Sequence, residues 1–395
     1  MLSRDKVVTT RTRSQVLPTV AFMLKPTAIS LLKGAYLKRI TLASLVVAAA
    51  AMVACSSDKS GSDNKDATAN SGGSVDLTGA GATFPYPLYS KWFSDYAAKT
   101  GVKINYQSIG SGGGIRQLSE GTVDFGASDS PMSDEDIAKA KGAVMHFPTV
   151  LGAVAVTYNL PEITAPLRLS GAVLGEIFMG TIKKWNDAKI AALNPGVKLP
   201  ASDILVVHRS DGSGTTFVFT DYLTAVSPTW ASGPGRGKEV PWPVGLGGKG
   251  NEGVSGQVKQ TPGAIGYVEL AYAKQNKLAF ASMQNAAGNF IAPSPESMTA
   301  AAAGVAEKLP GNTDYRLSIV NAAGADAYPI SSFTWILVYE QQADSVKGRK
   351  LRDFLRWALT EGESQAASLD YAPLPASMAT RLNARLDSIK VGTTQ

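Results

Sequence analysis

The sequence is poor in the side chains that most often hold metals or activate nucleophiles. Its 395 residues include one cysteine and two histidines. A single cysteine, Cys55, excludes a disulfide within this sequence and a site built from several thiolates. The histidines, His146 and His208, have no metal-ligand spacing and lie in no catalytic motif. We therefore predict neither a metal nor a cofactor.

Charge is also sparse, and its distribution argues against nucleic-acid binding. Charged residues make up 18% of the chain, and the net charge is +6. Residues 1–54 contain eight Lys or Arg and one acid, and removing these from the totals of 38 and 32 leaves 30 basic and 31 acidic residues in 55–395. A near-neutral body lacks the basic surface on which nucleic-acid binding depends. The 44% hydrophobic content and the length predict a globular chain with room for two domains.

The N-terminal region has the pattern of a targeting signal. Lys38 and Arg39 precede an apolar run of 15 residues, 40–54, which is short for a membrane-spanning helix and typical of a signal peptide. The run ends at Cys55 in a pattern similar to a bacterial lipoprotein cleavage site. We expect residues 1–54 to be the leader and Cys55 to carry the lipid.

Two alternatives remain open for this region. A plain secretory signal could be cut nearby with Cys55 incidental, and translation could start at Met23 instead of Met1. Residues 55–74 are polar and have no apolar period, which predicts a flexible tether after the anchor.

The most informative stretch is Arg-Ser-Asp-Gly-Ser-Gly-Thr-Thr, residues 209–216. It follows an apolar run and precedes a helical pattern, so we expect a strand, a turn and a helix start. Hydroxyl groups and unpaired backbone N–H groups at a helix N-terminus favour an anion. Residues two apart at a strand end face the same side, so that Asp211 can hold Arg209 toward a ligand. The alternative is an ordinary turn with a surface ion pair.

Three further segments repeat this order of strand, turn and helix. In residues 79–87, Thr83 lies just before a helix with an aromatic stripe. A glycine-rich turn places Ser111 where it could cap the next helix. Asp129 lies at the turn after a third apolar run. The glycine-rich turn matches neither the Rossmann nor the P-loop spacing.

Two nearly continuous apolar runs, residues 151–159 and 333–339, predict central strands that are covered on both faces. Strand patterns alternate with helix patterns between and around them. This alternation predicts an α/β architecture.

Eight motifs in chain order resemble the phosphate-binding proteins of the bacterial phosphate-specific ABC transporter, the PstS family. They are Thr-Gly-Ala-Gly-Ala-Thr-Phe-Pro (78–85), Ile-Gly-Ser-Gly-Gly-Gly (109–114), Asp-Phe-Gly-Ala-Ser-Asp (124–129), Phe-Pro-Thr-Val (147–150), Lys-Lys-Trp-Asn-Asp (183–187), Asp-Gly-Ser-Gly-Thr (211–215), Gly-Leu-Gly-Gly-Lys-Gly-Asn (245–251) and Pro-Gly-Ala-Ile-Gly-Tyr-Val-Glu (262–269). The resemblance covers about residues 75–395.

The resemblance implies a two-domain periplasmic binding protein of class II, with two crossover segments and closure like a Venus flytrap. It implies one lobe from residues 75–156 and 330–395 and a second from 157–329. The implied partners are inorganic phosphate and the permease and ATPase subunits of the transporter, with a lipid anchor as the membrane attachment. The implied location is the periplasm or cell envelope.

The resemblance also implies the ligand contacts, residue by residue. The implied phosphate contacts are Ala82, Thr83, Phe84, Ser111, Asp129, Arg209, Ser213, Gly214 and Thr215, with Asp211 orienting Arg209.

Asp129 is the informative member of this set. A carboxylate next to an anion is repulsive unless a proton lies between them, and phosphate carries one at neutral pH whereas sulfate does not. We therefore predict that Asp129 separates the two ions.

Two other function classes compete with this reading. The first is a secreted phosphatase or other hydrolase that uses Ser111 or Ser213 as its nucleophile. A Gly-x-Ser-x-Gly motif is absent, because Ile109 and Asp211 occupy the first glycine positions, and we predict no catalytic residue. The second is a related binder of sulfate or molybdate, against which Asp129 argues.

Overall fold

The structure is a computed structural model that describes residues 76–392 except 304 and 312. The predicted leader, the lipid attachment at Cys55 and the predicted tether over residues 55–74 all lie outside the described residues. Within the described part of the chain, no helix is long and apolar enough to cross a membrane.

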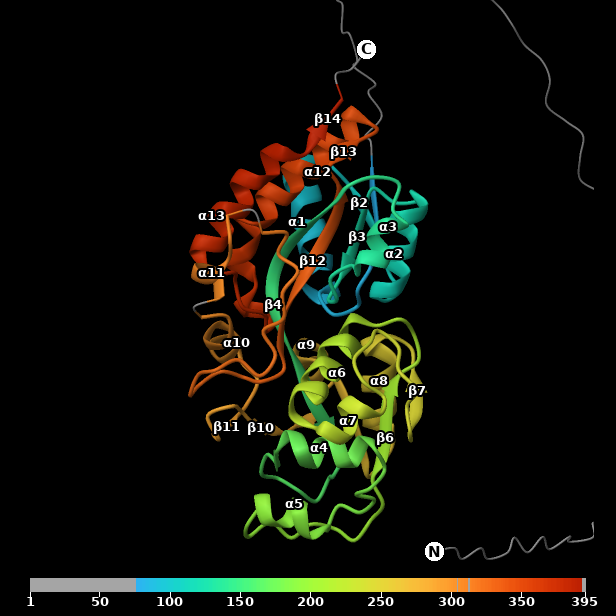
Figure 1. Ribbon diagram of the computed structural model, residues 1–395, viewed down its shortest axis with the longest axis vertical. Coiled ribbons are helices and arrows are strands. Elements are labelled where there is room, and N and C mark those ends of the chain that lie inside the picture. Colours follow the sequence, from blue (N-terminus) through green and yellow to red (C-terminus); the bar gives the residue numbers. More distant parts are fainter. Residues whose placement is uncertain (1–75, 304, 312, 393–395) are drawn as a thin grey trace, which may run out of the picture. The chain divides into compact units, whose positions relative to one another are not determined.

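One curled sheet forms the centre of the fold (Figure 1). Its strand order is β2-β1-β3-β12-β4-β8-β6-β7, and β9 pairs separately with β4. These strands are β1 (Leu77–Gly81), β2 (Ile104–Ser108), β3 (Phe125–Ser128), β4 (Val144–Tyr158), β6 (Leu205–Arg209), β7 (Leu246–Gly248), β8 (Ala264–Glu269), β9 (Ala279–Phe280) and β12 (Ser331–Tyr339).

The strand β4 belongs to two groups of strands. From Val144 to Ala153 it is antiparallel to β12, and from Val154 to Tyr158 it is antiparallel to β8. We call β2, β1, β3, β12 and residues 144–153 the first half of the sheet, and residues 154–158 with β8, β6, β7 and β9 the second half. Both β4 and β12 are almost entirely buried, as the sequence predicts.

The helices follow these two groups (Figure 1). Around the first half lie α1 (Tyr86–Thr100), α2 (Ser111–Glu120), α3 (Asp134–Ala138), α12 (Ser345–Ala358) and α13 (Ala376–Arg385). Around the second half lie α4 (Gly171–Phe178), α5 (Ala188–Leu193), α6 (Gly214–Val226), α7 (Pro228–Ser232), α8 (Gly250–Gln260) and α9 (Leu270–Gln275).

The remaining elements are short. The helices are α10 (Pro295–Ala302), which contacts β4 and β12, and α11 (Val305–Lys308), which contacts α13. Two small sheets are formed by β5 (Arg168–Leu169), β10 (Ser282–Gln284) and β11 (Phe290–Ile291), and by β13 (Gln341–Gln342) and β14 (Lys390–Val391). Three 3-10 turns span Gly362–Gln365, Ala367–Leu369 and Leu386–Ser388.

The predicted α/β fold of a two-lobed binding protein is confirmed by this arrangement. The chain enters the second half along β4 and returns to the first half at β12, which gives the two crossings. The lobe boundaries at 156/157 and 329/330 stay a prediction.

The aromatic stripe of α1 is part of the core. Its buried residues are Leu88, Tyr89, Trp92, Phe93 and Tyr96. The rings of Tyr89 and Trp92 stack with centroids 5.5 Å apart, and the indole N–H of Trp92 donates to the carbonyl of Gly362 at 2.8 Å. Phe93 also packs on Phe125 of β3 with ring centroids 6.2 Å apart, so the stripe fixes α1 against the first half of the sheet.

Candidate anion-binding site

The predicted contact residues come together at the carboxyl ends of three strands. Residues 82–84 follow β1, Asp129 follows β3, and Arg209 ends β6 just before the turn to α6. In open α/β sheets this edge is where ligands bind. The first half of the sheet supplies Ala82, Thr83, Phe84, Ser111 and Asp129, and the second half supplies Arg209, Ser213, Gly214 and Thr215. All of these residues are buried.

Thr83 lies in the turn between β1 and α1. Its carbonyl accepts hydrogen bonds from the backbone N–H of Tyr86 at 3.2 Å and from the hydroxyl of Tyr272 at 2.7 Å. Tyr272 belongs to α9, around the second half of the sheet. The turn that carries Thr83 is therefore tied to both halves.

The prediction that Ser111 caps a helix is wrong. The N-cap of α2 is Gly110, whose φ of 87° favours glycine, and Ser111 is already the first helical residue. The Ser111 hydroxyl instead accepts from the backbone N–H of Asp129 at 3.1 Å and lies 3.4 Å from Asp129 Oδ2, to which it donates. The shift of one residue joins Ser111 to the carboxylate instead of to its own helix.

Asp129 is a buried carboxylate with two side-chain donors. Thr334 Oγ1 donates to Oδ1 at 2.8 Å, and Ser111 Oγ donates to Oδ2. Burial raises the pKa of Asp129 to about 7, although Thr334, the charge of Arg209 and Ser111 act in the opposite direction. This group therefore changes its charge close to neutral pH.

Arg209 and Asp211 form the predicted pair. Arg209 Nε donates to Asp211 Oδ1 at 2.7 Å, and Nη2 lies 2.5 Å from Oδ2, so that the carboxylate grips the guanidinium at two points. The side chain of Arg209 is only 1% exposed. Burial by itself raises the pKa of Asp211, but the hydrogen bonds and charge of Arg209 outweigh it, and the pKa is lowered. The pair remains ionised inside the protein.

The start of α6 lies against the Ser111 and Asp129 pair. Ser213 is the N-cap, and its hydroxyl accepts from the backbone N–H of Thr216 at 2.9 Å. The first residue of the helix, Gly214, comes so close that a Cβ there would lie 2.4 Å from Ser111 Oγ and 2.6 Å from Asp129 Oδ2. The start of α6, where helix geometry leaves the first N–H groups without a carbonyl partner in the helix, therefore lies against the carboxylate.

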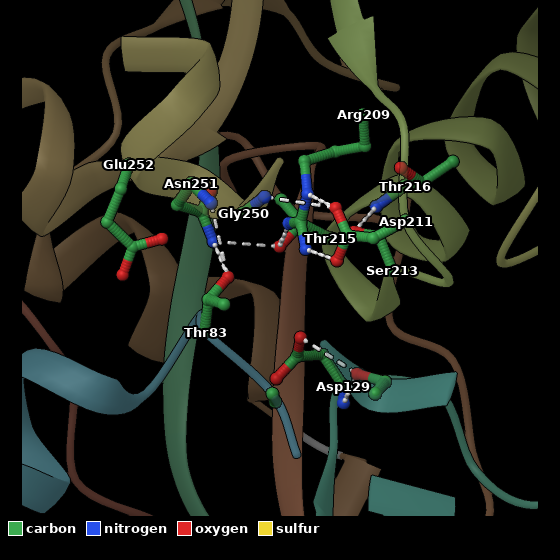
Figure 2. A network of polar contacts seen from close by, with 12 residues as sticks. Thr83, Asp129, Arg209, Asp211, Ser213, Thr215, Thr216, Gly250, Asn251 and Glu252 are labelled. Atoms are coloured by element: carbon green, nitrogen blue, oxygen red, sulfur yellow. Dashed lines mark hydrogen bonds and ion pairs between the residues drawn. The ribbon is translucent and has the colours of Figure 1, made fainter. Parts of the chain in front are cut away.

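Asn251 is the main site residue that the sequence reasoning missed. Its Nδ2 donates to Thr83 Oγ1 at 2.7 Å and to Thr215 Oγ1 at 3.1 Å, which connects the two halves of the sheet (Figure 2). Its motif, residues 245–251, supported the family resemblance but received no role. The available signal was a polar side chain at a helix start after a glycine-rich strand end.

Thr334 and Tyr267 were also missed. Thr334 is on β12 and binds Asp129, which is 205 residues earlier in the chain. The hydroxyl of Tyr267 accepts from the backbone N–H of Arg209 at 3.1 Å and is 2.7 Å from Thr216 Oγ1. These contacts join residues that are far apart in the chain, so no local sequence pattern predicts them.

The histidines do not contact the predicted nucleophiles in the described part of the chain. His146 Nε2 accepts from the backbone N–H of Met132 at 3.1 Å, and burial lowers the pKa of His146 to about 4. The ring of His208 stacks on Trp242, with centroids 4.7 Å apart. Among the described residues there is also no group of three or more His, Cys, Asp or Glu that could hold a metal.

The fold and this cluster define a two-lobed solute-binding protein of the α/β class, with buried donors arranged for an oxyanion. A family model described as the PBP superfamily domain matches residues 64–361. The chain belongs to the PstS family of phosphate-binding proteins.

Relatives at high identity carry this assignment. The phosphate-binding protein PstS of Xylella fastidiosa strain Temecula1 is 48% identical over 312 residues, which cover 79% of this chain and 85% of the relative. PstS of Pasteurella multocida strain Pm70 is 49% identical over 310 residues, which cover 78% and 89%. Both are named as binding proteins.

A solved structure shows the same fold. The phosphate-binding protein from Stenotrophomonas maltophilia matches with a TM-score of 0.60 at 20% identity, covering 79% of this chain and 94% of that protein.

Proposed function

We propose that this protein binds inorganic phosphate outside the cytoplasm and delivers it to the permease and ATPase subunits of a phosphate ABC importer. The proposal is supported by membership of the PstS family. The observation that carries it is the buried carboxylate of Asp129, which lies within a cluster of hydroxyl, guanidinium and helix N-terminal donors. The proposed contacts are those implied by the family resemblance, with Asp211 orienting Arg209. Ala82 is excluded from them, because its backbone N–H donates to the carbonyl of Ala127 at 2.9 Å.

The cluster has more than enough donors for a dianion. A hydrogen bond to a charged group contributes about 1.5 to 3 kcal/mol, so about ten of them would far exceed the roughly 8 kcal/mol of a micromolar complex. The desolvation of the dianion absorbs most of this gross gain. Donors without a large net charge therefore suffice, because the site replaces the water that the ion loses.

Asp129 supplies the specificity in this proposal. An ionised carboxylate accepts hydrogen bonds and cannot donate them, so it accepts the proton of monohydrogen phosphate. Sulfate has no proton at this pH and would leave two buried acceptors facing each other, at a cost of about 1 to 3 kcal/mol or more. The same argument speaks against a sulfate or molybdate binder.

Calorimetric titration of the purified protein tests the proposed function. At pH 8 we expect micromolar or tighter binding of phosphate, and binding of sulfate that is weaker by about 100-fold or more. Equal affinities for the two ions would contradict the role of Asp129. The absence of any phosphate binding would contradict the function itself.

We also propose that the protein is not an enzyme. The buried serines of the site, Ser111 and Ser213, bind Asp129 and the backbone of α6, and the relatives are named as binding proteins. Hydrolysis of a chromogenic phosphate ester above the rate of the Ser213→Ala variant would contradict this.

We propose, finally, that Cys55 anchors the protein in the cell envelope after cleavage of residues 1–54. The supporting observation is the apolar run that ends at Cys55. We expect the wild-type protein in the membrane fraction and the Cys55→Ser variant to be absent from it. Identical fractionation of the two would contradict a lipid at this position.

A further inference from the structure

Asn251 is a completely buried side chain that connects the two halves of the sheet at the site. It is the second residue of α8. Its Nδ2 donates to Thr83 Oγ1 at 2.7 Å and to Thr215 Oγ1 at 3.1 Å (Figure 2). Thr83 belongs to the turn after β1 and Thr215 to the first turn of α6. One amide group therefore contacts a hydroxyl from each half.

The orientation of this amide is fixed by a backbone contact. Asn251 Oδ1 lies 2.9 Å from the backbone N of Glu269, which is always a donor. The atom facing Glu269 must therefore be the oxygen, and the atom facing the two threonines must be the nitrogen. Since an NH₂ group has two hydrogens, it can donate to both hydroxyls at once.

The lone pairs of both hydroxyl oxygens are used by these contacts. Thr83 Oγ1 accepts from Asn251 Nδ2 and from the backbone N of Asn251 at 3.3 Å. Thr215 Oγ1 accepts from Asn251 Nδ2 and from Arg209 Nη1 at 3.2 Å. A hydroxyl has two lone pairs and one hydrogen. Each threonine can therefore make its remaining hydrogen bond only as a donor.

We propose that Asn251 is a positioning residue that makes the hydroxyls of Thr83 and Thr215 obligate donors and so sets the orientation of the bound ion. This inference rests on the proposed phosphate binding. Ionised ligand oxygens face the two threonines, and the one protonated oxygen faces Asp129. Neither threonine can then accept the second hydrogen of dihydrogen phosphate.

The charged groups around these contacts belong to both sides of the cluster. Arg209 and Asp211 lie beside Thr215, Glu252 and Glu269 lie beside Asn251, and Asp129 lies on the opposite side. The charge of Arg209 opposes the rise in the pKa of Asp129 that burial causes. A variant that changes Asn251 to alanine leaves all of these charges in place.

A double-mutant cycle tests the inference in the full-length protein. We expect Asn251→Ala to weaken phosphate binding by about 10- to 100-fold at pH 8, the loss of one or two hydrogen bonds to a charged ligand. The Thr83→Val background lacks one of the hydroxyls. In this background we expect Asn251→Ala to reduce the phosphate affinity by a factor at least about threefold smaller than in the wild type. Should Asn251→Ala not fold, Asn251→Leu, which has a similar shape, no donor and no charge, takes its place in the cycle.

Tyr272→Phe is the matched control. It removes a hydrogen bond between the two halves that also ends on Thr83, but at the carbonyl and not at the hydroxyl. We expect its loss of affinity to be the same, within about twofold, with and without Thr83→Val. If the loss of affinity caused by Asn251→Ala is also the same with and without Thr83→Val, Asn251 only connects the two halves of the sheet, and the inference is wrong.

The pH profile gives a second readout. In the wild type, the phosphate affinity should fall about tenfold or more from pH 8 to pH 6, because the complex admits one proton between the ligand and Asp129. In Asn251→Ala the freed threonine hydroxyls can accept, so this fall should be at least about threefold smaller. An equal fall in both proteins overturns the inference. Wild-type protein that does not bind phosphate overturns the proposed function as well, so the two failures are distinguishable.

Discussion

At the scale of single residues, the pairing of Arg209 with Asp211 decides how a buried cation can serve a ligand. Asp211 holds the guanidinium at two points and also accepts from the backbone N of Gly250 at 3.0 Å. The planar group is therefore fixed before any ligand arrives. Because the guanidinium is already oriented in the folded protein, ligand binding does not lose free energy by ordering it.

Replacing Arg209 with lysine tests this role. A lysine has no planar fork and cannot make the two contacts to Asp211 while reaching a ligand. We expect Arg209→Lys to weaken phosphate binding by about 10- to 100-fold, measured by calorimetry. Arg236→Lys is the control, since Arg236 pairs with Asp221 and is 54% exposed, and we expect its affinity to be unchanged. Equal losses in the two variants would contradict the role of Arg209.

The raised pKa of Asp129 makes the stability of the protein depend on pH. The pKa rises from 3.8 to about 7 on folding, so between these values the folded state holds more protons than the unfolded state. The free energy of unfolding therefore decreases as the pH rises through this window. Asp129→Asn removes this contribution. Without phosphate, we expect the stability of the variant relative to the wild type to increase by about 2 to 4 kcal/mol from pH 4 to pH 8.

Chemical denaturation at several pH values measures this difference. Among the described residues, the other acids with raised pKa values are the buried Glu269 and the partly buried Glu363, which are present in both proteins and cancel in the comparison. A relative stability that does not change with pH would show that folding does not raise the pKa of Asp129.

Sequence motifs predicted the residues that lie in local turns, and missed those that contact the turns from far away. Arg209 and Asp211 are two residues apart, and strand geometry alone suggested their pairing. Thr334 and Asn251 are placed by the sheet and by α8, and no local pattern shows which side chains the sheet brings together. Asn251 contacts Thr83 across 168 residues of sequence.

At the scale of elements, the start of α6 packs closely against Ser111 and Asp129 from the first half of the sheet. An added Cβ at Gly214 would meet both Ser111 Oγ and Asp129 Oδ2 at less than 3 Å. We expect Gly214→Ala to weaken phosphate binding by about tenfold or more, because the approach of α6 to Asp129 is blocked at a cost typical of overpacking. The free energy of unfolding should change by less than about 1 kcal/mol, since alanine is a better helix former than glycine.

Gly256→Ala is the matched control for this prediction. Gly256 lies in the middle of α8, and a Cβ there meets no atom within 4 Å. We expect a gain in stability of about 0.5 to 1 kcal/mol and no change in phosphate affinity. A Gly214→Ala variant that binds as well as Gly256→Ala would contradict the close approach.

The sequence predicted whether a central segment is a strand more accurately than it predicted where that strand begins and ends. The strand expected over residues 151–159 begins earlier, at Val144. Its pairing with β12 is interrupted between Thr334 and Trp335, whose partners are Val150 and Pro148, so that Thr149 is the extra residue of a bulge. A proline next to a bulge looks like the end of a strand in the sequence, because it has no N–H to donate to the neighbouring strand. Only the neighbouring strand shows that the pairing resumes.

At the scale of the whole molecule, contacts join the elements around the first half of the sheet to those around the second half. Gly112 N donates to the carbonyl of Gly212 at 2.9 Å, and Lys238 Nζ lies 2.7 Å from Asp136 Oδ2. We infer a hinge motion in which these contacts form around phosphate. Small-angle X-ray scattering should show a smaller radius of gyration with phosphate than without it, and identical curves would count against closure.

The central claim is that one carboxylate among donors makes the site specific for a protonated oxyanion. The most direct measurement is the ratio of phosphate to sulfate affinity in the wild type and in Asp129→Asn at pH 8. Asparagine can donate as well as accept, so its amide can face an ion that has no proton. We predict that phosphate binds the wild type at least about 100-fold more tightly than sulfate, and that Asp129→Asn reduces this ratio to about tenfold or less by weakening phosphate and strengthening sulfate. The same ratio in both proteins would contradict the claim.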